Sequence, residues 1–110
     1  MCGINGIVSN SYSKDRLREN IHSMNNDIIH RGPDSAGIFV ENNIGLGFRR
    51  LAIIDLSKNG DQPMLSQSRS LIIVFNGEIY NFKFLKDFLK KNFNASFIGS
   101  SDTEVLLMLI

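Results

Sequence analysis

The sequence predicts an α+β fold, in which helices are layered on a sheet. The order of the expected elements indicates this class, and the composition indicates that the chain folds. The expected elements run in the order strand, helix, several strands and then helices. The 110 residues are 43% hydrophobic and 21% charged, which is the balance of a folded globular chain. A chain of this length forms at most one domain with a modest core, so we expect residues 1–110 to belong to a single domain.

The first half of the chain predicts a strand, a helix, a loop and a hairpin. Residues 3–8 have the small, apolar character of a short buried strand. A helical stripe is formed by four apolar residues, Leu17, Ile21, Met24 and Ile28, with Ser13 as the expected N-cap. Residues 30–37 are expected to be irregular because they contain Gly-Pro, whose proline has no N–H donor. The pair Asn42-Asn43 between two apolar runs indicates a hairpin.

The second half predicts a central strand and two helices. The continuous apolar run 71–75 is typical of a strand that is covered on both faces. A helix is expected over about residues 82–91, and its apolar face consists of Phe84, Leu85, Phe88 and Leu89. Ser101 and Glu104 fit a Ser-x-x-Glu capping box, which places the start of the last helix at Ser101. Because the chain then ends on an uncapped helix, we expect it to be the front part of a longer protein.

Composition excludes several classes of function. A net charge of +1 and a pI of about 7.9 provide no basic surface for nucleic acid or for a membrane. The single cysteine cannot form an internal disulfide, and together with two histidines it makes a poor zinc site, so no metal is expected. No apolar run is long enough for a membrane span, and the N-terminus lacks the pattern of a secretory signal. We therefore expect a cytoplasmic protein.

Cys2 has a chemical option that no other position offers. Cellular aminopeptidases remove Met1 when the second residue is small, and cysteine is small enough. Cys2 would then carry a thiol and a free α-amine, a group whose pKa ordinarily lies near about 7.7–8.0. Such an amine can act as the general base for its own thiol. From position alone, a surface thiol at a mobile end is the simpler interpretation.

Asn76-Gly77 follows the apolar run 71–75 and is a candidate oxyanion hole. A thiol that attacks a carbonyl produces an oxyanion, which needs fixed hydrogen-bond donors. Asn76 offers a side-chain N–H, and Gly77 allows close approach to its backbone N–H. A plain turn is the alternative. Hairpin Asn-Gly pairs usually join two strands, whereas here a helix is expected next, which favours the functional interpretation slightly.

Several charged residues have two interpretations each. Arg49 or Arg50, at the end of an apolar strand, could form a bidentate pair with a carboxylate. Asp102, in the first turn of the last helix, could accept from an ammonium or simply complement the helix dipole. His30 could be a base, although fixing its loop is the simpler role. No phosphate-binding glycine motif occurs in the chain.

Taken together, the segments MCGI, HRGPDSAGI, RRLAIIDLS…QPM, NGEIYN and SDTE occur in the order and spacing of one family. The chain resembles the N-terminal glutaminase domain of class II glutamine amidotransferases, which are N-terminal-nucleophile hydrolases. Within this class, NGEIYN and HRGPD are similar to the glutamine-hydrolysing asparagine synthetases. The resemblance covers nearly the whole chain. It implies that residues 1–110 are the N-terminal part of a four-layer αββα sandwich that continues beyond them.

The resemblance also implies roles for single residues. Cys2, freed by removal of Met1, would attack the side-chain amide of L-glutamine and release ammonia, leaving glutamate after hydrolysis. Asn76 and Gly77 would form the oxyanion hole. The glutamine pocket would be completed by Arg50 for the α-carboxylate, Asp102 for the α-ammonium, Glu78, and the backbone of Ile53 and Ile54. The HRGPD loop would organise the site near the nucleophile. Phe48 stands where family members often have His, and we expect it only to repack a strand.

Partners and alternatives follow from the same resemblance. It implies a C-terminal synthetase domain that uses ATP and Mg²⁺ to amidate aspartate, no cofactor within residues 1–110, and room for a homodimer of the full-length protein. One alternative is an amidotransferase with another acceptor, such as a surface-polysaccharide sugar. A second alternative is a non-catalytic truncated module. We expect the isolated segment to have little activity, because half a sandwich leaves the run 71–75 with an unpaired strand edge.

Overall fold

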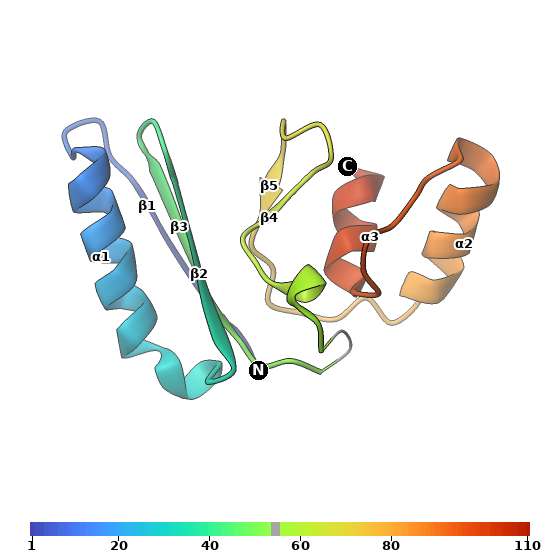
Figure 1. Ribbon diagram of the computed structural model, residues 1–110, viewed down its shortest axis with the longest axis horizontal. Coiled ribbons are helices and arrows are strands. Elements are labelled where there is room, and N and C mark those ends of the chain that lie inside the picture. The colour runs from blue at the N-terminus through green and yellow to red at the C-terminus, as the bar shows by residue number, and fades with distance from the viewer. Residues whose placement is uncertain (54–55) are drawn as a thin grey trace.

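The computed structural model describes residues 1–53 and 56–110. The elements in chain order are β1 (Gly3–Val8), α1 (Lys14–Asp27), the 3-10 turn η1 (Ile29–Arg31), β2 (Ser35–Glu41), β3 (Ile44–Arg50), the 3-10 turn η2 (Lys58–Gly60), β4 (Met64–Leu65), β5 (Ile72–Ile73), α2 (Phe82–Phe93) and α3 (Asp102–Leu109). Figure 1 shows two halves side by side, one with β1–β3 and α1, the other with β4, β5, α2 and α3. The expected α+β class is confirmed.

The sheet of the first half is antiparallel, with β3 in the centre and β1 and β2 on either side. The turn between β2 and β3 contains Asn42 with a φ of 52°, so the hairpin prediction is confirmed. The register pairs Gly3 of β1 with Arg49, and Ser35 of β2 with Arg50. This register brings the N-terminus of the chain to the end of β3.

Helix α1 covers one face of this sheet and supplies the core of the first half. Its predicted cap is confirmed, because the Ser13 hydroxyl accepts from the Arg16 N–H at 3.2 Å. Leu17 and Ile21 are fully buried. The prediction that residues 3–8 form a buried strand is half right. Side chains of a strand alternate between its faces and α1 covers only one of them, so Ile4 on the other face is 47% exposed.

Two loop and strand predictions need correction. Residues 30–37 are not all irregular, because the 3-10 turn η1 includes His30 and β2 begins at Ser35, where pairing with β3 starts. The run 71–75 is not a central strand. Only Ile72 and Ile73 form β5, and in the described residues β4 is its sole hydrogen-bonded neighbour, so Leu71 is 42% exposed. The backbone of Phe75 pairs instead with a side chain, that of Gln62.

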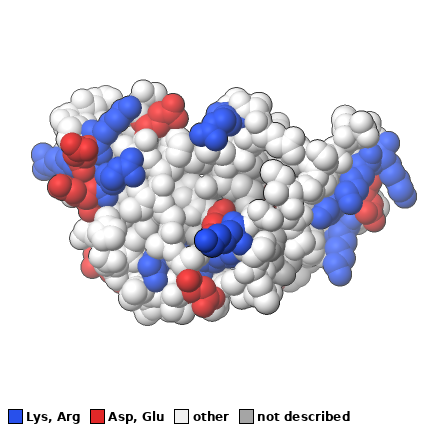
Figure 2. Space-filling model, viewed as in Figure 1, with Lys and Arg blue, Asp and Glu red and all other residues white. Residues whose placement is uncertain are grey.

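The two predicted helices of the second half are confirmed. In α2 Leu89 is buried, but Phe84 and Phe88 on the expected apolar face remain exposed. Basic side chains gather over α2 (Figure 2), which carries Lys83, Lys86, Lys90 and Lys91. Helix α3 starts after its cap Ser101, whose hydroxyl accepts from the Glu104 N–H at 3.2 Å. Among the helices of residues 1–53 and 56–110, none has the length and apolar character that crossing a membrane requires.

Candidate active site

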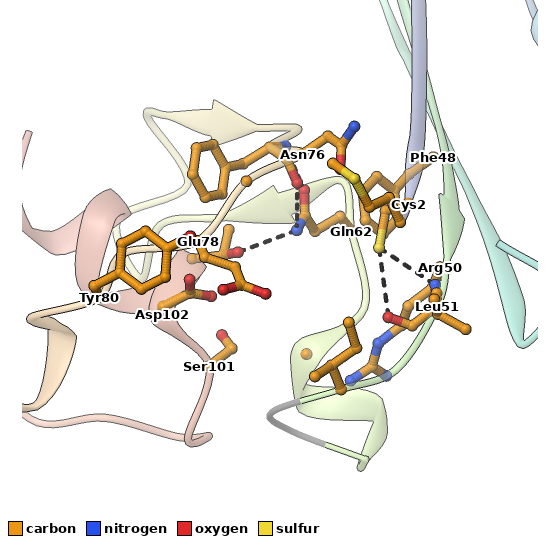
Figure 3. Close-up of a pocket in the computed structure, with 16 residues that line it drawn as sticks. Cys2, Phe48, Arg50, Leu51, Gln62, Asn76, Glu78, Tyr80, Ser101 and Asp102 are labelled. Atoms are coloured by element: carbon orange, nitrogen blue, oxygen red, sulfur yellow. Dashed lines mark hydrogen bonds between the residues drawn. The ribbon is translucent and has the colours of Figure 1, made fainter. Parts of the chain in front are cut away.

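A cavity of about 320 Å³ lies between the two halves of the molecule (Figure 3). The first half contributes Cys2, Arg50 and Ile53 to its wall, and the second contributes Asn76, Gly77, Glu78 and Asp102. These residues are as far apart as a hundred positions in the sequence. The structure therefore brings the predicted site residues together, except Ile54, which lies outside the described residues.

Cys2 lies at the end of β3, next to Leu51. Its Sγ accepts from the Leu51 N–H at 3.3 Å and donates to the Leu51 carbonyl at 3.5 Å. The Cys2 carbonyl accepts from Arg31 Nη2 at 3.5 Å. The thiol is half-buried and held by these contacts, so it is not a thiol at a free chain end. His30 is exposed and is not part of the cavity lining.

The HRGPD loop fastens the end of β3 close to Cys2. The Gly32 carbonyl accepts from Arg49 Nε at 2.8 Å, and a Cβ at Gly32 would overlap the Arg49 carbonyl carbon, so the two backbones touch. The Asp34 N–H donates to the Arg50 carbonyl at 3.0 Å, and its carboxylate accepts from the Ala52 N–H at 2.8 Å. This loop holds the segment from which Arg50 reaches the cavity.

Arg50, and not its neighbour, is the arginine in the cavity wall. Successive residues of a strand point to opposite faces, and Arg49 turns to the Gly32 carbonyl while Arg50 lines the cavity. Nη1 of Arg50 donates to the Ser57 carbonyl at 2.6 Å and to Asp61 Oδ1 at 2.8 Å. These two bonds fix the guanidinium in place.

The Asn76-Gly77 turn borders the cavity directly after the backbone of Phe75. Figure 3 shows the Asn76 side chain directed to the side of the cavity that holds Cys2. A Cβ at Gly77 would lie 2.7 Å from the ring atom Cζ of Phe75, so a residue without a side chain lets the turn pack under this ring. The turn offers an amide side chain and an accessible backbone N–H to the cavity.

Asp102 is the first residue of α3 and is only 6% exposed. Its Oδ2 accepts from the Ile79 N–H at 2.8 Å. Figure 3 shows Asp102 and Glu78 on the side of the cavity opposite Cys2 and Arg50. One wall therefore carries a guanidinium and the other carries carboxylates, a distribution of charge that complements a small molecule with both an anionic and a cationic group.

Comparison with known proteins decides the family. A family model described as a glutamine amidotransferase domain matches residues 1–110. The chain belongs to the glutamine amidotransferase domain family. The resemblance found in the sequence is therefore confirmed, and the α+β structure agrees with the fold class of N-terminal-nucleophile hydrolases.

Relatives of this amidotransferase domain include synthetases and an amidase. The putative asparagine synthetase [glutamine-hydrolyzing] 2 of Methanocaldococcus jannaschii is 44% identical over 127 aligned positions, with coverage of 99% of this chain and 24% of the relative. Asparagine synthetase [glutamine-hydrolyzing] 1 of Bacillus subtilis is 44% identical, with coverage of 97% and 17%. The amidase chyE of Penicillium rubens is 37% identical, with coverage of 99% and 17%. The chain thus spans about a quarter or less of the length of these curated relatives.

Gln62 also lines this cavity, and sequence reasoning did not single it out. Its Oε1 accepts from the Phe75 N–H at 2.6 Å, and its Nε2 donates to the Phe75 carbonyl at 3.3 Å and to Thr103 Oγ1 at 3.2 Å. Gln62 occurs in one of the segments that carry the family resemblance, but its residue type did not indicate a chemical role. Only its position between two distant segments shows what it contacts.

One aromatic residue, Phe48, lies next to Cys2 in the cavity wall (Figure 3). Phe48, at the centre of the sheet, is fully buried and lines the cavity. Its burial agrees with the expected packing role.

In the part of the chain that the structure describes, no three His, Cys, Asp or Glu side chains gather in a way that could hold a metal ion.

Proposed function

We propose that this chain supplies the glutaminase activity of a glutamine-hydrolysing asparagine synthetase. One observation carries the proposal. A chain of the amidotransferase family gathers a thiol, an Asn-Gly turn, a guanidinium and carboxylates around one cavity of about 320 Å³. The relatives that are 44% identical are named as enzymes of this kind.

The proposed nucleophile is the Sγ of Cys2 after Met1 has been removed. Met1 itself is exposed and borders the cavity, so its removal would widen the space beside the thiol. Sγ would attack the side-chain amide carbon of glutamine while the new α-amine accepts the thiol proton. The amine would then return this proton to the leaving nitrogen, so that the C–N bond breaks and ammonia departs. Water would hydrolyse the remaining thioester, which releases glutamate and restores the thiol.

The proposed oxyanion hole consists of the Asn76 side-chain N–H and the Gly77 backbone N–H. Both residues border the cavity that Cys2 also lines. Donors that are fixed before the reaction stabilise the negative charge as it develops on the carbonyl oxygen. Loss of one such donor typically lowers kcat by about 10²–10³-fold.

Recognition of glutamine is assigned to the charged walls. Arg50 would bind the α-carboxylate and Asp102 the α-ammonium. Glu78 and the backbone of Ile53 and Ile54 would complete the pocket. These contacts would select free glutamine over a glutaminyl residue within a peptide, because the α-groups of the latter are already in amide bonds.

Amidation of aspartate is assigned to a synthetase domain outside residues 1–110, and ATP and Mg²⁺ belong to that domain. The lengths of the relatives support this assignment, because the segment that aligns with this chain is at most 24% of each of the three relatives described above. We place this enzyme in the cytoplasm.

The proposal is tested with the protein produced from its complete reading frame and with its Cys2→Ala variant. Glutamate release from glutamine should fall by about 10³-fold or more in the variant, because the nucleophile is gone. Asparagine formation supported by free ammonia should remain, which shows that the variant is folded. If glutamate release is the same in both proteins, the proposed function is wrong.

A mass measurement of the N-terminus tests the role of the α-amine separately. We expect Cys2 to be the first residue of the active protein, because only then is its amine free. An active enzyme that retains Met1 would contradict this part of the mechanism.

A further inference from the structure

We propose that Gln62 is a positioning residue that holds the Asn76-Gly77 turn in place for catalysis. The inference rests on the proposed glutaminase function and adds to it a residue whose side-chain amide bonds to other residues of the protein. Gln62 is 7% exposed, and its amide bonds two segments that are distant in the sequence.

The side-chain amide of Gln62 makes the hydrogen bonds to the Phe75 backbone that a neighbouring strand would otherwise make. It accepts from the Phe75 N–H at 2.6 Å and donates to the Phe75 carbonyl at 3.3 Å. A residue that is bonded through both its N–H and its carbonyl has little freedom to rotate. The next residue is Asn76, so its starting position is set by Gln62.

The same amide connects the turn to the N-terminus of α3. Nε2 of Gln62 donates to Thr103 Oγ1 at 3.2 Å. The adjacent Asp102 accepts from the Ile79 N–H at 2.8 Å. The residue before the turn, Phe75, is thus linked through Gln62 to Thr103. Ile79, which follows the turn, is bonded to the neighbouring Asp102 of the same helix.

The backbone of Gln62 contacts β2, a strand of the sheet whose first strand follows Cys2. A Cβ at Gly37 of β2 would overlap the Gln62 carbonyl oxygen, so the two backbones are in direct contact. The Gly37 carbonyl accepts from Asn25 Nδ2 of α1 at 3.0 Å, which fixes this part of β2. Gln62 therefore joins the half that carries Cys2 to the half that carries the oxyanion donors.

This arrangement predicts which kinetic constant depends on Gln62. Oxyanion donors act in the transition state, so a displaced turn lowers kcat. A displacement of about 1 Å can cost about 10²-fold in rate. Arg50 is held by the Ser57 carbonyl and the Asp61 carboxylate, and neither bond involves the Gln62 side chain, so the contribution of Arg50 to glutamine binding should remain.

The experiment uses the full-length protein and the variants Gln62→Ala and Gln62→Glu. In both, kcat for glutamate release should fall about 10- to 100-fold while KM for glutamine stays within about threefold of wild type. Gln62→Glu keeps the size of the side chain, but places an oxygen where Nε2 donates to two acceptors. The matched control is Gln67→Ala, because Gln67 also donates to a backbone carbonyl, that of Ser96 at 3.0 Å, on the exposed surface. Its kcat should be unchanged.

Alkylation of Cys2 by iodoacetamide separates positioning from loss of structure. The Sγ–C bond forms as iodide leaves and no oxyanion develops, so the alkylation rate should stay at the wild-type value in both Gln62 variants. The proposal is overturned if Gln62→Glu keeps wild-type kcat, or if kcat and the alkylation rate fall together. If Cys2→Ala leaves glutamate release intact, the glutaminase function itself has failed, which is a different result.

A second variant keeps the proposal testable if the Gln62 variants do not fold. Thr103→Val removes one partner of Nε2 at nearly constant volume and leaves the bond to Phe75. We expect kcat to fall about three- to tenfold with KM unchanged, since a typical hydrogen bond contributes about 0.5–1.5 kcal/mol. Wild-type kcat in Thr103→Val would contradict the role of this link.

Discussion

Replacing Asp102 by Asn should weaken glutamine binding and leave the fold intact. One carboxylate oxygen of Asp102 accepts from the Ile79 N–H at 2.8 Å. In the variant only the amide oxygen can take over this bond, because the NH₂ group is a donor. The NH₂ group must then occupy the place of the other carboxylate oxygen, where the α-ammonium of glutamine is proposed to lie. The variant therefore lacks the negative charge of the carboxylate, and its NH₂ group, a donor, faces the α-ammonium, which is also a donor.

The size of the effect follows from the burial of Asp102. The residue is 6% exposed, so solvent screens its interaction little. Hydrogen bonds to charged groups contribute about 1.5–3 kcal/mol, and a factor of ten in affinity corresponds to about 1.4 kcal/mol. We therefore expect KM for glutamine to rise about 10- to 150-fold. Asp102→Ala should also lower stability by about 1–3 kcal/mol, because the Ile79 N–H loses this acceptor.

The assay measures glutamate release from glutamine by the full-length protein, with urea unfolding as the measure of stability. A second substrate, 4-carbamoylbutanoate, has the amide and the carboxylate of glutamine but no α-ammonium. Wild-type enzyme should prefer glutamine in kcat/KM by about 10- to 150-fold, and Asp102→Asn should lose most of this preference. If the variant keeps both the wild-type KM and the wild-type preference, Asp102 does not bind the α-ammonium and serves only to hold Ile79.

Two further predictions concern residues behind the cavity wall. Asp61→Asn should raise KM for glutamine at most about fivefold, because the Asp61 carboxylate that holds Arg50 is 40% exposed and such pairs contribute about 0.2–1 kcal/mol; a larger rise in a glutamate-release assay would contradict this screening. Gly37→Ala should lower the free energy of unfolding by about 1–3 kcal/mol in urea titrations, because the added Cβ overlaps the Gln62 backbone. Gly6→Ala is its control, since its Cβ would lie 3.3 Å from the nearest atoms, and an equal loss there would argue against the overlap.

Helices were the part of the fold that the sequence predicted best. The signals for α1 are a cap at Ser13 and an apolar stripe that includes Leu17 and Ile21, and both act within a few residues of the chain. The cap of α3 at Ser101 is equally local. Such signals depend little on the rest of the molecule, so they could be recognised without it.

The run 71–75 shows where local pattern fails. Its apolar residues are typical of a covered strand, but a strand exists only where another strand provides hydrogen-bonding partners. In the described residues β4 provides them for Ile72 and Ile73 alone. At Phe75 the partner is the side chain of Gln62. Nothing in the composition of the run indicates how far its pairing extends.

For the candidate site too, some features could be predicted from the sequence and others required the folded structure. The candidate reactive groups could be named without the structure: a thiol at Cys2, an amide and a glycine in one turn, and charged residues whose roles the family resemblance implied. The family resemblance named Arg50, and the structure agrees, because Arg50 lines the cavity while Arg49 turns to the Gly32 carbonyl. The link that Gln62 makes between the two halves is visible only in the folded chain. The chemistry of a group belongs to its residue type. Its distance and direction relative to other groups depend on strand register and on packing between elements remote in the chain, which no short stretch of sequence encodes.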